Sequence, residues 1–124
     1  MNASKAIAAG IVALGALLFA TCSIGPAYPT GKATVIGTYE QDYAGERSLV
    51  IQYRVDNTGT TVIESGTVSF KVGTDAREYY ASSSKAYRIL PGHEVYATAG
   101  VTYRVATETA TAVPAAEVVD EFYE

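Results

Sequence analysis

From residue 33 onward, apolar and polar positions alternate along the chain with a period of two, which is typical of strands with one face in a core. The clearest run is LVIQYRV at 49–55, in which every second residue is apolar. Alternation of this kind predicts antiparallel strands over 48–56, 66–72 and 94–105. The residues predicted to be buried on these strands are Leu49, Ile51, Tyr53, Phe70, Val101 and Tyr103.

Three weaker segments complete the pattern. Over 33–39, Val35, Gly37 and Tyr39 are expected to share one strand face. Short strands are predicted over 78–82 and 87–90, with the serine run between them as an exposed connection. Turns are expected where Gly, Pro, Asn and Asp gather, because these residues accept or stabilise turn conformations. The predicted turns lie at 42–47, 56–59 and 91–93.

About six strands with short links, and no convincing helix before residue 107, predict an all-β fold. The expected architecture is two antiparallel sheets packed as a β-sandwich over 33–106. The strings YRVDNTG, VSFKV and LPGHEV, at 53–59, 68–72 and 90–95, resemble those of bacterial extracellular immunoglobulin-like domains, including the FxLYD-like ones. The resemblance implies an immunoglobulin-like sandwich that serves as an accessory, adhesion or spacer module, and it implies no catalytic residue.

The first 22 residues follow the plan of a secretory signal peptide. Lys5 is their only charged residue, 6–21 are apolar or small, and Cys22 follows. Residues 23–32, SIGPAYPTGK, are expected to form a short tether. The uncharged run is also about the 20 residues that span a bilayer as a helix, so an uncleaved signal or transmembrane helix is an alternative.

The tetrapeptide before the tether, Phe19-Ala20-Thr21-Cys22, is similar to a bacterial lipoprotein signal, although Phe19 and Thr21 depart from its usual Leu and small residue. The resemblance implies that Cys22 becomes the lipidated first residue of the mature protein. The other two interpretations are an ordinary secreted protein and a membrane-anchored one. All three place the domain outside the cytoplasm, and two of them make the membrane a partner.

The last segment, 107–124, is acidic. Pro114 is a residue that can open a helix, and Val118 and Phe122 are spaced to share one side of it. A short helix, a solvated terminus and a docking peptide for a partner are the three interpretations of this segment.

The formal net charge of −4 argues against nucleic-acid binding, which needs a basic surface. A single cysteine allows no intrachain disulfide. Neither a phosphate-binding glycine loop nor a nucleophile elbow occurs, so no cofactor and no enzymatic activity are expected. The only histidine, His93, is expected in an exposed turn, and a hydrolase would need it beside a hydroxyl and a carboxylate.

Acidic side chains gather in three predicted loops, but none forms the dense acidic pattern of a calcium site. The pairs are Asp42 with Glu46, Asp56 with Asn57, and Asp75 with Glu78. No metal site is expected from them.

Two tyrosines, Tyr80 and Tyr96, fall on presumed outer sheet faces, where a ring can stack on a sugar or anchor a protein. They are the candidate binding residues, although ordinary strand tyrosines are the favoured explanation. The expected function is therefore a non-enzymatic interaction or structural module of the cell envelope, with an envelope protein as a further partner. The alternative is a small sugar-binding or peptide-binding protein, or an accessory to an envelope enzyme.

Overall fold

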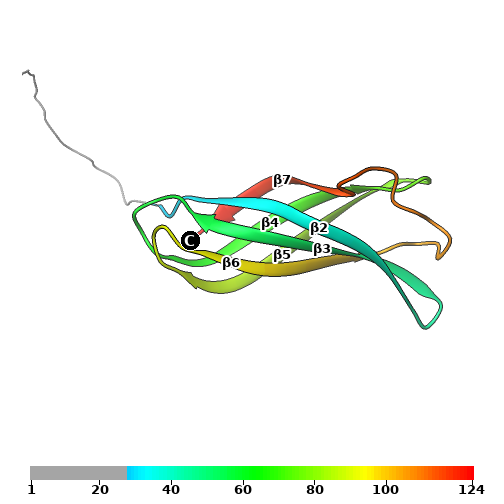
Figure 1. The fold of residues 1–124 in the computed structure, drawn as a ribbon, viewed down its shortest axis with the longest axis horizontal. Helices are drawn as coiled ribbons and strands as arrows, with labels where there is room; N and C mark the ends of the chain where they lie inside the picture. Colours follow the sequence, from blue (N-terminus) through cyan, green and yellow to red (C-terminus); the bar gives the residue numbers. More distant parts are fainter. Residues whose placement is uncertain (1–27) are drawn as a thin grey trace, which may run out of the picture.

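The computed structural model of the protein describes residues 28–124 (Figure 1). This part of the chain is all-β and contains no helix. The segment 1–22 and Cys22, expected to form the signal or membrane helix and the lipidation site, lie outside the described residues. The strands are β2 (Gly31–Tyr43), β3 (Glu46–Asn57), β4 (Ile63–Gly73), β5 (Glu78–Ile89), β6 (Glu94–Thr102) and β7 (Ala116–Tyr123).

The strands form two three-stranded antiparallel sheets, with the orders β2-β3-β6 and β5-β4-β7. Figure 1 shows them as two long layers that lie one against the other. The central strands β3 and β4 supply most of the core between the layers. Tyr53 of β3 and Phe70 of β4 meet edge to face, with ring centroids 5.1 Å apart. The expectation of two packed antiparallel sheets is thereby confirmed.

Five of the six residues predicted to be buried are buried, and the sixth, Val101, is half-buried. Val101 lies on β6, an edge strand of its sheet, where the opposite sheet covers the inner face incompletely. The predicted strand over 94–105 also ends early, because β6 stops at Thr102. Tyr103 is nevertheless buried, and its backbone amide donates to the Arg47 carbonyl at 2.8 Å.

All three predicted turns are present, each with the backbone geometry that its residues favour. Ala44 and Gly45 join β2 to β3 with φ values of 52° and 82°, the positive values that a tight hairpin turn requires. Gly92 turns the chain before β6 with a φ of 80°. The Asn57 carboxamide accepts the Gly59 amide at 3.0 Å, which is the local bond expected of an Asn in a turn.

The predicted break at the serine run is wrong, because β5 is one continuous strand. Ser82 and Ser84 each place their hydroxyl 2.9 Å from a hydroxyl of β4, on the outer face. Ser83 points inward and accepts a hydrogen bond from the buried Tyr53 hydroxyl at 2.9 Å. The serine hydroxyls therefore have hydrogen-bond partners while the segment stays in the strand, so the serine run does not have to form an exposed connection.

The expectation of a short helix or a solvated tail over 107–124 is also wrong. Residues 116–123 form β7, which pairs with β4, so the domain extends beyond residue 106. The ring of Tyr123 is buried, and the Glu121 carboxylate also points inward. Glu121 accepts the Tyr123 hydroxyl and the Ala33 amide of β2, each at 2.8 Å. This carboxylate therefore joins the edges of the two sheets.

At its other end the domain begins earlier than expected, since β2 starts at Gly31 and not after a tether that reaches residue 32. A bulge between Val35 and Gly37 then shifts the register of β2 against β3. Because one extra residue reverses the side-chain alternation, Tyr39 points to the outer face, opposite to Val35. The prediction that these two residues share a face is wrong for this reason.

Candidate functional site on the outer face of the β2-β3-β6 sheet

The two candidate tyrosines lie on different sheets. Tyr80, on β5, is 69% exposed, and Tyr96, on β6, is 64% exposed. Their strands belong to opposite layers, so the two rings point away from each other and cannot form one site. Tyr96 lines a hollow in the surface, whereas Tyr80 lines neither that hollow nor the one on its own sheet.

The Tyr96 hollow has a volume of about 400 Å³. It lies on the outer face of the β2-β3-β6 sheet and is lined by Ile36, Gln52, Tyr96, Ala97 and Thr98. Gln52 and Thr98 face each other across β3 and β6. The hollow therefore combines one exposed aromatic ring, one carboxamide and one hydroxyl.

The hollow depends on the bulge in β2. Gly37 is paired with Gln52, and the bulge turns Ile36 outward beside it. A Cβ atom added at Gly37 would lie 3.0 Å from the Gln52 Oε1 atom. Contacts this short are unfavourable, so a glycine is needed here for the Gln52 side chain to keep its position.

The hollow is electrically neutral. None of its five lining residues carries a charge. A charged residue, Arg54, pairs with Tyr96 across the strands. The Arg54 Nε atom lies 3.0 Å from the Asp56 Oδ2 atom, and the hydrogen bond to this carboxylate raises the pKa of the guanidinium. The opposite charges of Arg54 and Asp56 therefore offset each other beside the hollow.

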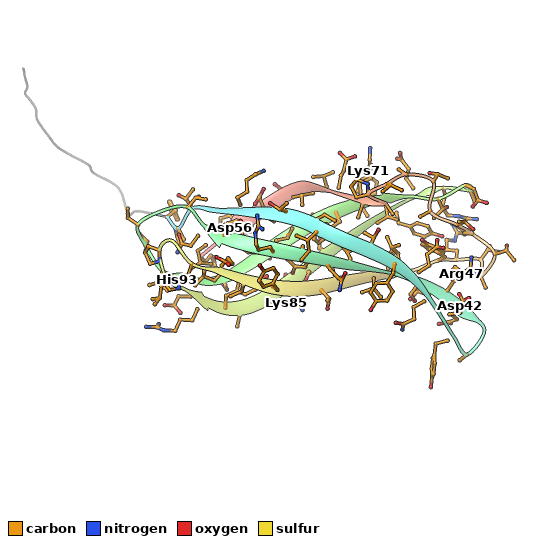
Figure 2. All side chains as sticks on the ribbon, viewed as in Figure 1. Asp42, Arg47, Asp56, Lys71, Lys85 and His93 are labelled. Atoms are coloured by element: carbon orange, nitrogen blue, oxygen red, sulfur yellow. The ribbon has the colours of Figure 1, made fainter. Side chains whose placement is uncertain are left out.

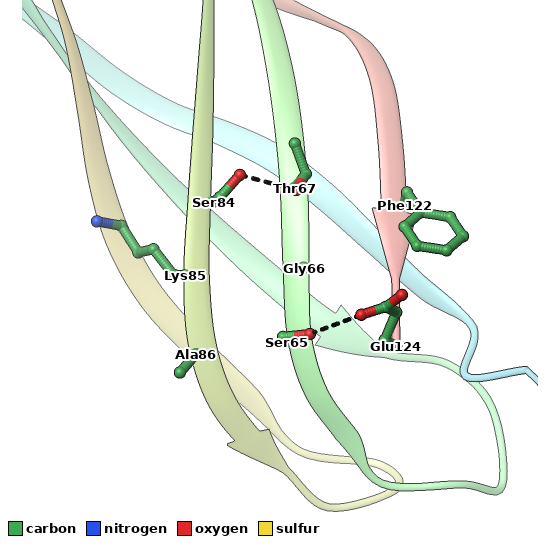
Figure 3. Close-up of a pocket in the computed structure, with 8 residues that line it drawn as sticks. All are labelled: Ser65, Gly66, Thr67, Ser84, Lys85, Ala86, Phe122 and Glu124. Carbon is green, nitrogen blue, oxygen red and sulfur yellow. Dashed lines mark hydrogen bonds between the residues drawn. The ribbon is translucent and has the colours of Figure 1, made fainter.

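A second hollow, which we call the Ser84 hollow, lies on the outer face of the β5-β4-β7 sheet and measures about 300 Å³ (Figure 3). Its hydroxyls bond to neighbouring side chains: Thr67 lies 2.9 Å from Ser84, and Ser65 donates to Glu124 at 3.5 Å. The one ring in its lining, Phe122, extends from β7 (Figure 3). The hydroxyls of the Ser84 hollow thus have hydrogen-bond partners among its own side chains.

A buried carboxylate fixes the loop after β6. Glu108 is only 3% exposed and accepts hydrogen bonds from the hydroxyls of Thr74 and Tyr79 and from the Val105 amide, at 2.7 to 3.1 Å. The Arg77 Nε atom lies 3.1 Å away as an ion pair, although its N–H is not aligned for a hydrogen bond. Burial opposes ionisation of Glu108, but these donors prevail and lower its pKa.

Glu40 completes this cluster from the other sheet. Its carboxylate accepts the Tyr103 hydroxyl at 2.9 Å and the Ala110 amide at 2.7 Å. Burial and the bond to Glu40 raise the pKa of Tyr103. Tyr103 in turn stacks on Tyr79, with ring centroids 5.7 Å apart. The hydrogen bonds of Glu40 and Glu108 thus hold the loop after β6 in place.

The remaining chemical candidates are spread over the molecule. Figure 2 places His93 at one end of the domain and Asp42 with Arg47 at the other. Within residues 28–124, the His93 side chain forms no hydrogen bond with a hydroxyl or a carboxylate. The alternative of a hydrolase requires such a contact.

The acidic loops use their oxygens internally. Asp42 binds Arg47 at 2.7 Å, and Asp75 accepts the Thr109 amide at 3.1 Å. In the described part of the chain, no three His, Cys, Asp or Glu side chains are grouped so that they could hold a metal ion.

Sequence reasoning identified Tyr96 and missed the residues around it. Gln52, Thr98 and Ile36 lie at outward positions of their strands, but alternation alone does not indicate that they meet, because the bulge that brings Gly37 opposite Gln52 was not predicted. The available signal was Gly37, because a glycine inside a strand often marks a bulge or a close approach.

Comparison of the chain with protein-family models finds no match, and comparisons with curated proteins and with solved structures find none that is similar. A search of residues 28–124 for a helix long and apolar enough to cross a membrane also finds none. The functional argument therefore rests on the chain itself.

Proposed function

We propose that the protein is an exported, membrane-tethered and non-enzymatic interaction module of the cell envelope. The observation that carries the proposal is how the domain begins after the leader pattern. The Thr30 carbonyl accepts the Thr58 amide at 3.0 Å, and β2 starts at Gly31. A chain that leaves a membrane through residues 23–29 would hold the domain by one end, with both outer sheet faces open to partners.

The tether sets the distance from the membrane. Seven extended residues span at most about 25 Å, so the domain would stay close to the bilayer. Stable attachment needs more than one acyl chain, or one chain with a basic patch. The chain after the leader has a net charge of −5, since the leader holds Lys5 and no acid. Several acyl chains on Cys22 would meet the requirement without a basic patch.

The two packed antiparallel sheets and the turn at Asn57 support the finer proposal of an immunoglobulin-like sandwich. Internal hydrogen bonds engage the buried Glu108 and the half-buried Glu40, which supports a scaffold role for both carboxylates. A domain of this kind acts through its surface, as an accessory, adhesion or spacer module.

Metabolic labelling with a fatty-acid analogue tests the tether. The wild type should take up label and stay in the membrane fraction. Cys22→Ser should lose the label and either keep its leader or appear in the soluble fraction. Ser23→Ala, a matched change at the next position, should keep the label. Removal of the leader from unlabelled wild type would identify an ordinary secreted protein, and unlabelled full-length chain in the membrane would identify a signal anchor.

The second candidate function is a ligand-binding protein of the envelope. The observation that favours it is the Tyr96 hollow, where an exposed ring lies beside a carboxamide and a hydroxyl on the open face of a sheet.

A further inference from the structure

We propose that the Tyr96 hollow binds a neutral oligosaccharide of hexopyranose units with equatorial hydroxyls. The proposal rests on the second candidate function and names its ligand class. It does not depend on the lipid tether, because the hollow belongs entirely to the outer face of the β2-β3-β6 sheet.

The first reason is the ring of Tyr96. It is 64% exposed on an edge strand and lines the hollow. An aromatic ring offers a large flat apolar surface with only two side-chain torsions to immobilise. Hexopyranoses with equatorial hydroxyls present flat C–H faces that match such a surface. Ile36, which is 49% exposed, adds an apolar contact in the same hollow.

The second reason is the polar pair next to the ring. The Gln52 carboxamide offers both donors and an acceptor, and the Thr98 hydroxyl can donate or accept. Adjacent sugar hydroxyls need this mixture, since each of them donates and accepts at once. Gly37 leaves the space in which the Gln52 Oε1 atom lies, so the carboxamide can lie against the backbone of β2 at the hollow.

The third reason is charge. The lining is uncharged, and Arg54 beside it is paired with Asp56 at 3.0 Å. An anionic ligand would meet a chain with a net charge of −4, and a cationic ligand would find no carboxylate in the lining. A volume of about 400 Å³ falls within the range of about 300–1,000 Å³ that is usual for small-ligand sites. A neutral polar chain that lies across the sheet fits these features.

The test uses the full-length protein in a sugar-free zwitterionic detergent, with cellotetraose and chitotetraose as probes in isothermal titration calorimetry. Tyr96→Ala should weaken binding about tenfold or more, as expected for removal of a central aromatic contact. Gly37→Ala should weaken binding by displacing the Gln52 carboxamide. Tyr80→Ala, an equally exposed tyrosine on the other sheet, and Phe122→Ala, in the Ser84 hollow, should change affinity less than about twofold.

Three results would overturn the proposal. The first is that the wild type shows no saturable binding of either probe at millimolar concentrations. The second is that Phe122→Ala or Tyr80→Ala loses as much affinity as Tyr96→Ala. The third is that the wild type binds sialyllactose, an anionic sugar, more tightly than it binds the two neutral probes. Failure of the tether proposal would appear in the labelling experiment and leave these affinities unchanged. Circular dichroism of each variant separates loss of folding from loss of binding.

Discussion

Removing the ring of Phe70 should destabilise the fold strongly. Phe70 is fully buried at the centre of β4 and meets Tyr53 of the opposite sheet at 5.1 Å. Truncation of a buried Phe to Ala costs about 3–5 kcal/mol, because apolar transfer energy is lost and a cavity remains. The edge-to-face pair accounts for about 0.5–1.5 kcal/mol beyond the buried area. Domains of this size have total stabilities of about 5–15 kcal/mol, so Phe70→Ala should lower the free energy of unfolding by a large fraction.

Urea unfolding followed by circular dichroism measures this loss, with the slope of the free energy against urea checked for a change. The matched control is Phe122→Ala. Phe122 is 55% exposed on the outer face of the same sheet, and its truncation should cost less than about 0.5 kcal/mol. A loss below half a kcal/mol for Phe70→Ala, or equal losses for the two variants, would mean that the assignment of inner and outer faces is wrong.

Three further predictions concern buried polar and glycine positions. Tyr53→Phe should cost about 1–3 kcal/mol, because it leaves the Ser83 hydroxyl without its donor, and adding Ser83→Ala should recover part of that loss in urea unfolding. Gly66→Ala should lower the melting temperature by several degrees, since its Cβ would lie 2.6 Å from the ring of Tyr123; an unchanged melting temperature would contradict this packing. The pKa of Glu108 is lowered from its ordinary 4.5, so its stabilising effect is present above pH about 4.5 and lost as the pH falls through the folded value. Glu108→Gln should therefore weaken the fall in the free energy of unfolding at acidic pH. Urea unfolding at several pH values measures this, and an unchanged pH dependence would show that Glu108 is not the group responsible.

The sequence predicted the parts of the fold that depend on local chemistry. The central strands β3 and β4 follow from period-two alternation, and the hairpin at Gly45 and the turn at Asn57 follow from residue type. These features need no knowledge of which strands pair.

Features that depend on tertiary partners were missed. The serine run looked like a loop, but Ser83 has a buried partner in Tyr53 that lies 30 positions away in the chain. The acidic last segment looked helical or solvated, but pairing with β4 makes it a strand, and Glu121 turns inward to bind the Ala33 amide. The polarity of a residue does not reveal which distant groups it bonds to in the folded protein. Patterns in a single sequence therefore assign these polar segments to the surface.

The candidate site was predicted in part for the same reason. Tyr96 could be placed outward from alternation, but its neighbours depend on the register of three strands. The bulge at Ile36 changes which side chains of β2 reach that face. Tyr80 carried the same sequence signal and lies on the opposite sheet, away from the hollow.

Nuclear magnetic resonance of the wild-type protein can test the proposal that a sugar binds on the outer face of the β2-β3-β6 sheet. Backbone amide shifts would be followed while cellotetraose is added. Saturable shifts concentrated at Gln52, Tyr96 and Thr98 are expected. Shifts concentrated around Ser84 and Phe122, or no saturable shift at millimolar sugar, would contradict it.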